Sequence, residues 1–443
     1  MDSFIQEIRG LFGKNEDFFL LQDYVSDAPV VLLGFKTLLD LTKTKSVLYK
    51  NIESMLSAGK SSEEILFNIG EVKEKDIKMA TSTLLEGKLI ILIENSKKYI
   101  VFEPVPKSLN RSVQSPENEN VLQGALNSFT EDIDTNIGIM RKQLITTDLF
   151  VQSFTTGKNQ KRKISLLYLE SQADKDLVRK IVNRIETNLD MDINNMQGLT
   201  TLMGFSSWEA ISKFHTTELP FQAVHLLNKE RVVLFVDQLP FAFILPNFFW
   251  DLFAMENDRN FPKPIMIAIR AVRVIGILIT LISPGLYVAL VAVNPEVLQI
   301  ELALSIARSR EGVPYPALVE IILMLLILEL ILEASVRLPK SIGPTITMVG
   351  GIILGQAAVE AKLVSNLLII ILAATTIANS TVVSFQNSVS IRVFKYVVVL
   401  LSAIFGILGL VAGLVLVCAY FASLNTFGFS YLYVNLKKDE MNG

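Results

Sequence analysis

The pattern of apolar and polar positions divides the chain into two halves. Residues 1–263 mix charged, polar and apolar positions as a water-soluble domain does. From about residue 265 to residue 436 the chain is mostly apolar, and its charges gather at a few places. A membrane helix needs about 20 apolar residues. The pattern therefore predicts a water-soluble N-terminal half followed by a helical transmembrane domain.

Four or five membrane crossings are expected in the apolar half. The candidate stretches are Val274–Val293, Leu318–Val336, Ser341–Val359, Leu363–Ile391 and Tyr396–Leu436. The last stretch has room for one tilted span with an interfacial tail, or for a span with a re-entrant piece. Pro284 lacks a backbone N–H, so we expect it to kink or interrupt the first span.

The water-soluble half contains an internal repeat. Leu84–Pro104 matches Leu226–Pro246 without a gap, and each stretch reads as two short strands joined by a tight turn. Upstream, Val30–Phe35 resembles Ile164–Leu169 in the same way. One helix is expected in each copy, over Ser46–Leu56 and over Leu177–Leu189. Chance similarity of two amphipathic hairpins is the alternative to two similar α/β units.

These patterns predict a fold class and four domains. The N-terminal half is expected to be α/β, with two similar α/β units and a helical connector, ahead of an α-helical transmembrane domain of four or five spans. The expected domains are a first cytoplasmic α/β unit over 1–110, the helical connector over 111–145, a second cytoplasmic α/β unit over 146–262 and the transmembrane helical domain over 263–443.

Basic residues suggest an orientation for these spans. Met1–Phe4 lacks the basic and apolar regions that open a signal peptide, so the N-terminal half is expected to be cytoplasmic. Lys263, Arg270 and Arg273 precede the first span and agree with the positive-inside rule. Further basic residues after the second and fourth spans agree with it too, whereas two arginines at 308 and 310 run against it. The rule leaves the side of the C-terminus open.

Composition and charge exclude several protein classes. The chain has 443 residues, of which 51% are apolar and 19% are charged, with a mean hydropathy of +0.44. A soluble chain carries about a quarter of charged residues, so a purely cytosolic enzyme is not expected. A net charge of −3 argues against a nucleic-acid partner. The single cysteine, Cys418, lies in an apolar stretch and is expected to be buried and unreactive.

The sequence offers no recognisable catalytic chemistry. It has no GxxxxGK[ST] phosphate loop, no GxGxxG after a strand, no HExxH and no GxSxG. Its two histidines and one cysteine leave little for metal binding. We therefore expect a protein that is not an enzyme, with no catalytic, cofactor-binding or metal-binding residues.

Charges inside the apolar half are the most informative polar residues, because charges in a membrane are costly and are usually paired or functional. Glu329, Glu333 and Arg337 are spaced by four and share one helix face. One interpretation is a gating or ion-path cluster. The favoured interpretation is structural pairing, of Glu333 with Arg337 and of Glu320 or Glu329 with one of the two arginines, Arg308 or Arg310.

Several separated motifs carry a family resemblance. The string Ser305–Pro316 (SIARSREGVPYP), followed by Glu320, resembles the GerA family of spore germination proteins. Ile282–Leu290, Glu333–Pro339 and Gly355–Val359 match other family motifs in the same order, as do Ser115-Pro116-Glu117, Gly124, Phe129-Thr130-Glu131, Asn136 and Arg141 in the connector. A germinant-receptor A subunit is favoured over the related stage V sporulation protein AF.

The resemblance implies a function, a location and partners. Such A subunits belong to the spore inner membrane and act with a transporter-like B subunit, which binds the nutrient, and with a C-subunit lipoprotein. They are implied to form a homo-oligomeric ring of five copies, which encloses an ion channel that opens on nutrient binding. The implied function is a nutrient-gated release of cations that starts germination. A non-conducting scaffold that relays a partner's signal is the alternative, and a secondary transporter is a weaker third reading because no inverted repeat is found.

One helical face is the candidate pore lining. Each residue of a helix advances about 100°, so five positions fall within an arc of about 80°: Thr345, Val349, Ile352, Gln356 and Glu360. In a symmetric ring, two of them would form an apolar constriction and the glutamate an acidic ring. Gly351 and Gly355 have the GxxxG spacing that lets helices approach closely. Buried packing of the whole segment is the alternative.

Aromatic residues precede the first span. Phe248, Phe249 and Trp250 could form a belt at the membrane interface. Packing inside the water-soluble half is an equally weighted alternative.

Overall fold

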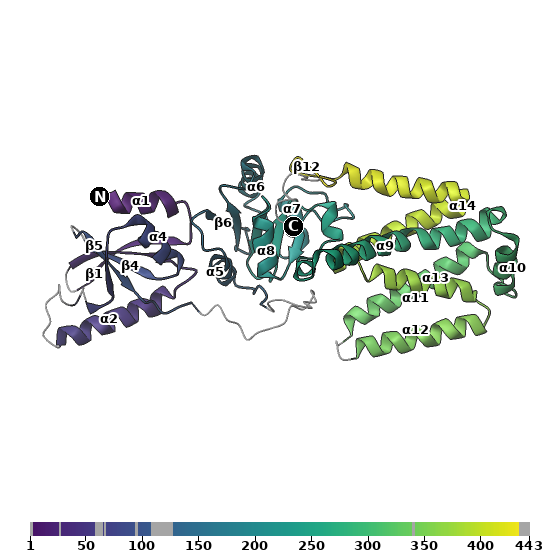
Figure 1. Cartoon of the computed structure of the whole chain (residues 1–443), viewed down its shortest axis with the longest axis horizontal. Coiled ribbons are helices and arrows are strands. Elements are labelled where there is room, and N and C mark those ends of the chain that lie inside the picture. The colour runs from purple at the N-terminus through teal and green to yellow at the C-terminus, as the bar shows by residue number, and fades with distance from the viewer. Residues whose placement is uncertain are drawn as a thin grey trace. The chain divides into compact units, whose positions relative to one another are not determined.

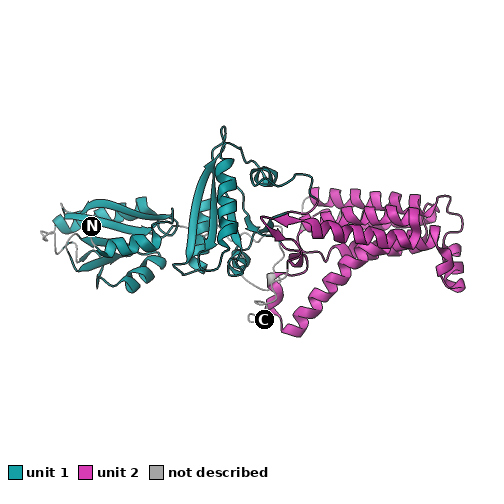
Figure 2. Ribbon diagram, turned by 90° about the horizontal axis from the view of Figure 1, so that it is seen from above, with its two compact units in different colours: residues 1–209, 213–247 teal, residues 210–212, 248–443 magenta. Residues whose placement is uncertain are grey.

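The structure is a computed structural model that describes residues 3–25, 28–57, 65, 68–93, 96–107, 127–338 and 342–433. The chain divides into two compact units (Figure 2). The N-terminal region comprises residues 1–209 and 213–247, and the helical region comprises residues 210–212 and 248–443. The predicted loop at 115–120, the connector glycine at 124 and the first half of the connector lie outside the described residues.

The first sheet of the N-terminal region is antiparallel, with the strand order β1-β2-β4-β5-β3. Its strands are β1 Phe18–Val25, β2 Ala28–Phe35, β3 Glu71–Glu74, β4 Leu89–Ile93 and β5 Lys98–Phe102. Its helices are α1 Ser3–Phe12, α2 Leu41–Ser57 and α4 Ile77–Leu85.

Strand β2 is apolar at consecutive positions because helices cover both faces of the sheet. Val31 packs in one core cluster with Ile8 of α1 and Ala80 of α4. Its neighbour Val30 packs in a second cluster with Leu48 of α2. Successive side chains of a strand point to opposite faces, so a strand buried on both faces reads as a continuous apolar run.

The second sheet repeats this topology. Its strands are antiparallel in the order β6-β7-β9-β10-β8, the same order as in the first sheet. The strands are β6 Leu149–Thr156, β7 Arg162–Leu169, β8 His215–Thr217, β9 Val232–Val236 and β10 Ala242–Leu245. The helices are α5 Ile133–Gln143, α6 Lys175–Thr187, α7 Met196–Leu202 and α8 Pro220–Leu227. The two stretches that match in sequence thus form equivalent strand pairs, β4–β5 and β9–β10.

A buried ion pair joins the two α/β units. Arg141 of α5 donates from Nη2 to Oδ1 of Asp17 at 2.7 Å, and both side chains are almost fully buried. The guanidinium of Arg141 also lies over the Phe35 ring, 4.2 Å from its centroid. Beside this pair, Oδ1 of Asn15 accepts from the backbone N–H of Val151 at 2.8 Å. The connector arginine therefore holds the first unit against the start of the second.

The helical region begins with two short 3-10 turns, Phe249–Leu252 and Glu256–Asn260. Its helices are α9 Lys263–Val288, α10 Ile300–Ser309, α11 Ala317–Arg337, α12 Gly343–Glu360, α13 Asn366–Asn379 and α14 Phe385–Ser423. A π turn, Ala289–Val293, and a 3-10 turn, Pro295–Val297, follow α9, and the strands β11 Asn425–Thr426 and β12 Phe429–Ser430 follow α14. The long helices lie alongside one another (Figure 1).

Helix α14 is a hairpin of two helices rather than one long span. Gly406 interrupts it with φ +64° and ψ −137°, a conformation that glycine adopts more readily than other residues. A β-carbon placed on Gly413, in the second half, would lie 3.1 Å from the Cα atom of Val398, in the first half. The two halves therefore run side by side. The rings of Phe394 and Phe421 are also 5.3 Å apart. A single tilted span, one of the two arrangements expected for Tyr396–Leu436, is therefore wrong for the described residues. Cys418, which was expected to be buried, is exposed on the second half of the hairpin.

The predicted span Leu363–Ile391 is not a single helix either. Helix α13 ends at Asn379, and α14 begins at Phe385. Between them, the hydroxyls of Ser380 and Thr381 donate to the backbone carbonyls of Thr376 and Ala378, at 3.1 and 2.7 Å. Serine and threonine compete in this way with backbone hydrogen bonding, and the chain turns at this polar run. Pro284, by contrast, lies inside α9, which continues to Val288.

By length and composition, two helical segments are long and apolar enough to cross a membrane, Lys263–Val293 and Gln386–Ser423, although the second segment folds back on itself at Gly406. Met348–Glu360 and Asn366–Asn379 are shorter apolar helices. Helix α11 spans 21 residues but carries three glutamates and an arginine. The expected number of four or five crossings stays a prediction.

Candidate functional site

A buried glutamate organises one end of the helical region. Glu320, near the start of α11, is 1% exposed. Its Oε1 accepts from the backbone N–H of Ser365 at 2.5 Å, and its Oε2 lies 3.3 Å from Nε of Arg310 and 3.4 Å from the hydroxyl of Tyr287. Ser365 caps the N-terminus of α13. One carboxylate thus connects α9, the loop after α10, and the turn between α12 and α13.

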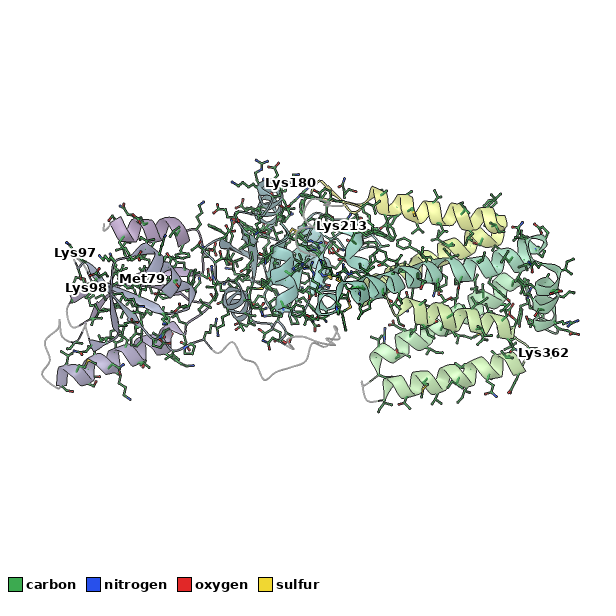
Figure 3. The ribbon with its side chains drawn as sticks, in the orientation of Figure 1. Met79, Lys97, Lys98, Lys180, Lys213 and Lys362 are labelled. Atoms are coloured by element: carbon green, nitrogen blue, oxygen red, sulfur yellow. The ribbon has the colours of Figure 1, made fainter. Side chains whose placement is uncertain are left out.

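The family-like string Ser305–Pro316 surrounds this contact. Arg310 also donates to the backbone carbonyl of Tyr315 at 3.0 Å, which closes the loop on itself. Gly312 has φ +88°, and a β-carbon there would lie 2.7 Å from Cδ of Lys362. Figure 3 shows Lys362 in the turn between α12 and α13. The positive φ of residue 312 therefore favours glycine in this loop.

A second glutamate of α11 meets two cations of α14. Oε2 of Glu329 accepts from Nη1 of Arg392 at 2.7 Å, and its Oε1 accepts from Nζ of Lys395 at 3.1 Å. The hydroxyl of Tyr396 lies 3.3 Å from the same Oε1. The sequence predicted that the basic residues at 392 and 395 follow the fourth span, but they lie inside α14, because that helix begins at Phe385.

The predicted pair of Glu333 and Arg337 lies at the end of α11. Nη2 of Arg337 donates to Oε1 of Glu333 at 2.6 Å, and the two side chains are 78% and 61% exposed. Glu329 and Glu333 share a helix face but have different partners. Glu329 pairs with residues of α14, and Glu333 pairs with a residue of its own helix. Arg310 meets Glu320, whereas Arg308 is exposed on α10.

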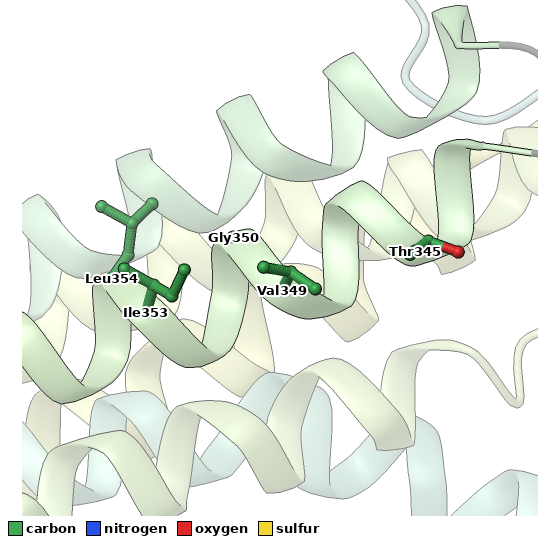
Figure 4. Close-up of a pocket in the computed structure, with 5 residues that line it drawn as sticks. All are labelled: Thr345, Val349, Gly350, Ile353 and Leu354. Atoms are coloured by element: carbon green, nitrogen blue, oxygen red, sulfur yellow. The ribbon is translucent and has the colours of Figure 1, made fainter.

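The polar positions on α12 are exposed in the single chain. Thr345, Val349, Ile352, Gln356 and Glu360 are all exposed, with Val349 at 45% and Ile352 at 61%. Nε2 of Gln356 donates to Oε1 of Glu360 at 2.9 Å. An apolar hollow of about 380 Å³ lies on this helix, lined by Thr345, Val349, Gly350, Ile353 and Leu354 (Figure 4).

The glycines of α12 differ in their surroundings. A β-carbon placed on Gly355 would lie 4.0 Å from Cγ2 of Ile369 in α13. A β-carbon on Gly351 would meet no atom within 4 Å among the described residues. Among the described residues, therefore, no other helix packs closely against α12 at Gly351.

The aromatic run before α9 belongs to the helical region. The Phe249 ring packs against Phe253, Phe421 and Tyr431, with centroids 5.1, 5.6 and 6.1 Å away. The backbone N–H of Phe249 donates to the carbonyl of Tyr431 at 2.9 Å. The segment before α9 therefore lies beside the segment after α14, and packing of Phe249 inside the α/β half, the alternative from sequence, is wrong.

Three residues from within the second α/β sequence also pack in the helical region. The backbone N–H of Ala210 donates to the hydroxyl of Tyr420 at 2.9 Å, and its carbonyl accepts from the hydroxyl of Ser390 at 2.5 Å. Ile211 is 2% exposed in the same apolar cluster as Phe421. Since Ser390 and Tyr420 lie on different halves of the α14 hairpin, the segment 210–212 bridges both halves.

An ion pair between Asp258 and Arg273 connects the segment before α9 to that helix. Asp258 accepts from Nη1 and Nη2 of Arg273, at 2.5 and 2.7 Å, and Nη1 also donates to the carbonyl of Phe253. Burial by itself would raise the pKa of Asp258. The hydrogen bonds from Arg273 and from the backbone of Met255, together with the charges of Arg273 and Arg270, outweigh burial and lower this pKa below its usual value.

Sequence reasoning included Glu320 with Arg310 among its expected pairs, but it missed the other partners of Glu320 and Glu329. Tyr287, Ser365 and Tyr396 gave no signal, since single polar residues in apolar stretches are common. Arg392 and Lys395 did give one, because two cations three residues apart in an apolar run need a carboxylate partner. No group of three or more potential metal ligands occurs among the described residues.

Comparison with known proteins agrees with these motifs. The family described as Bacillus/Clostridium GerA spore germination protein matches residues 6–442. The spore germination protein GerLA of Bacillus cereus is 29% identical over 435 residues, which cover 96% of this chain and 88% of that protein. The spore germination protein B1 of Bacillus subtilis (strain 168) is 33% identical over 353 residues, which cover 79% of this chain and 72% of that protein.

A solved structure is also similar to part of the chain. It is the crystal structure of the N-terminal domain of the A subunit of the Bacillus megaterium spore germinant receptor GerK3. It is 20% identical, covers 54% of this chain and 92% of that chain, and superposes with a TM-score of 0.39. Because the family match spans nearly the whole chain, this chain belongs to the Bacillus/Clostridium GerA family of spore germination proteins.

Proposed function

We propose that this chain is the A subunit of a spore germinant receptor, and that its copies form a nutrient-gated ion channel in the spore inner membrane. Membership of the GerA family and the names of the relatives support the role in germination. Two long apolar helical segments support a membrane location. The proposed assembly is a ring of five copies that acts with a transporter-like B subunit and a C-subunit lipoprotein.

The observation that carries the channel proposal is the exposed face of α12. Thr345, Gln356 and Glu360 are polar and exposed on a mostly apolar helix. Polar and charged side chains are costly against lipid and usually face a water-filled path or another protein segment. A ring of copies in which this face lines a central path satisfies that requirement.

The order of residues along α12 suggests how such a path conducts. Val349 and Ile352 would form an apolar constriction, which gates by excluding water, and Glu360 would form an acidic ring that favours cations. Gly351, beside which a β-carbon would meet no described atom within 4 Å, would accept a helix of the neighbouring copy.

Cation release from spores tests the channel. Spores carrying Val349→Ala should release cations without nutrient or germinate prematurely, and Glu360→Lys should suppress cation release. Ile370→Ala and Glu301→Lys are the matched controls, since both positions are exposed but lie off the proposed face, on α13 and α10. Normal assembly with parental ion release in both test variants would refute the α12 path.

A non-conducting scaffold is the second candidate, and the segment 210–212 favours it. This segment leaves the second α/β sequence and packs across the α14 hairpin, so it could relay movement without any ion path. Tyr420→Phe would then block germination while purified assemblies conduct no ions at all. Conduction by the purified assembly would exclude this candidate.

The proposed orientation places the N-terminal region in the cytoplasm. Reporters fused near residue 150 test it. A cytoplasmic reporter should be active there, and activity confined to a reporter that works outside the membrane would contradict the orientation.

A further inference from the structure

The cluster on α11 and α14 holds more positive than negative charge. Arg392 and Lys395 both contact Glu329, so two cations share one carboxylate. The side chains of Arg392 and Lys395 are only 13% and 7% exposed, and that of Glu329 is 28% exposed. No second carboxylate of the described residues lies within 4 Å of either cation. The cluster therefore carries an excess charge of about one unit where water has little access.

Hydrogen bonding shows that the cluster is incomplete. Nη1 of Arg392 donates to Glu329, but its Nε–H is buried and has no acceptor among the described residues. Lys395 makes one hydrogen bond, to Oε1 of Glu329, although an ammonium group has three donors. Both carboxylate oxygens of Glu329 are already occupied. Donors of both cations therefore lack an acceptor among the described residues of this cluster.

The position along the helices fits an acceptor at the membrane surface. Arg392 is the eighth residue of α14, so it lies about 10 Å from the start of that helix. Arginine and lysine side chains extend toward the headgroup layer from such depths. A phosphate is a good match for a guanidinium, because it accepts two parallel N–H bonds.

We propose that Arg392 and Lys395 bind the phosphate of an anionic phospholipid between α11 and α14. The proposal needs these helices to lie in a bilayer, but it does not need the chain to form a channel. Glu329 orients both cations and limits the excess charge to one unit, and that excess favours a lipid with net negative charge over a zwitterionic one. Basic pockets between membrane helices bind anionic headgroups in this way.

The full chain in nanodiscs tests the proposal. Nanodiscs of phosphatidylcholine alone are compared with nanodiscs that also contain phosphatidylglycerol, and lipid retention is measured by native mass spectrometry after release from the disc. We expect retention of phosphatidylglycerol over phosphatidylcholine, and about a fivefold loss of that preference in Arg392→Gln and in Lys395→Gln. Lys395→Arg, which keeps the charge, should retain it.

Glu329→Gln separates lipid binding from a purely structural ion pair. Removing this carboxylate raises the excess charge, so the preference for phosphatidylglycerol should increase. Arg337→Gln is the control, since Arg337 is an exposed cation of α11 paired with its own helix. Equal retention of both lipids by the parent, or an unchanged preference in both neutralised variants, would overturn the proposal.

Inorganic phosphate tests whether the site binds the phosphate of a lipid or free phosphate from solution. Phosphate added to the protein in detergent should not replace phosphatidylglycerol at physiological concentration. If it stabilises the chain equally and phosphatidylglycerol adds nothing, the site binds free phosphate and the lipid assignment is wrong.

Discussion

The side-chain oxygen of Asn294 occupies the space where a β-carbon of residue 406 would lie. A β-carbon built on Gly406 would approach Oδ1 of Asn294 to 1.8 Å, and the same oxygen accepts from the backbone N–H of Ile407 at 3.1 Å. The turn of the α14 hairpin is thus closed by a residue that follows α9. Glycine is required there for the close approach and for its positive φ.

Gly406→Ala should therefore destabilise the helical region. The backbone conformation alone costs about 1–3 kcal/mol for a non-glycine residue, and the overlap with Asn294 adds to it. We expect a lower unfolding midpoint of the full chain in detergent. Gly350→Ala is the control, because it lies in a helix and meets no described atom within 4 Å. In the double variant with Asn294→Ala, part of the loss should return; equal losses in the single and double variants would contradict the steric explanation.

Arg141→Met should weaken the joint between the two α/β units. It leaves the buried Asp17 without its bidentate partner, and breaking a buried pair costs about 3–5 kcal/mol. Thermal unfolding of the full chain measures the loss. Arg179→Met is the control, since Arg179 pairs with Asp176 in solvent, with exposed fractions of 69% and 67%, and such pairs contribute at most about 1 kcal/mol. Similar midpoints for the two variants would contradict this role of Arg141.

Glu320→Gln and Glu333→Gln should have different effects. Glu320 is buried and holds Ser365 and Arg310, so its neutralisation should lower the unfolding midpoint of the chain. Glu333 and Arg337 form an exposed pair, so Glu333→Gln should leave that midpoint nearly unchanged. If a neighbouring copy buries this pair, the second variant should weaken assembly, which crosslinking and size-exclusion chromatography measure. Normal assembly and germination in Glu333→Gln would count against that interface.

Asp258 should make stability fall in acid. Its pKa is lowered in the folded chain, so its charged form stabilises folding fully above the unfolded pKa of about 3.9. That contribution is lost as the pH falls below this value and through the lower folded pKa. The difference in unfolding midpoint between the parent and Asp258→Asn should be constant above about pH 5 and shrink below about pH 4. Asp190→Asn, at an exposed position, should show no such trend; a pH-independent difference for Asp258→Asn would contradict the lowered pKa.

Elements with local sequence patterns could be predicted from the residues alone. Alternating and continuous apolar runs located β4, β5, β9 and β10, and the gap-free match predicted two similar units, which the structure shows to share one strand order. The i to i+4 spacing predicted the pair of Glu333 and Arg337, because both residues lie on one helix. The motif string from 305 to 316 indicated the family, since it is one contiguous stretch of sequence.

The tertiary structure decided what depends on distant residues. The hairpin at Gly406 was hidden inside a uniformly apolar run, because its conformation is fixed by Asn294, which lies 112 positions earlier. The partner of Glu329 lies on α14, 63 positions away from it at Arg392, and helix spacing cannot report such a contact. Arg141 reaches Asp17 across two units for the same reason. Periodicity records which side of an element is buried, whereas only packing determines which other element covers it.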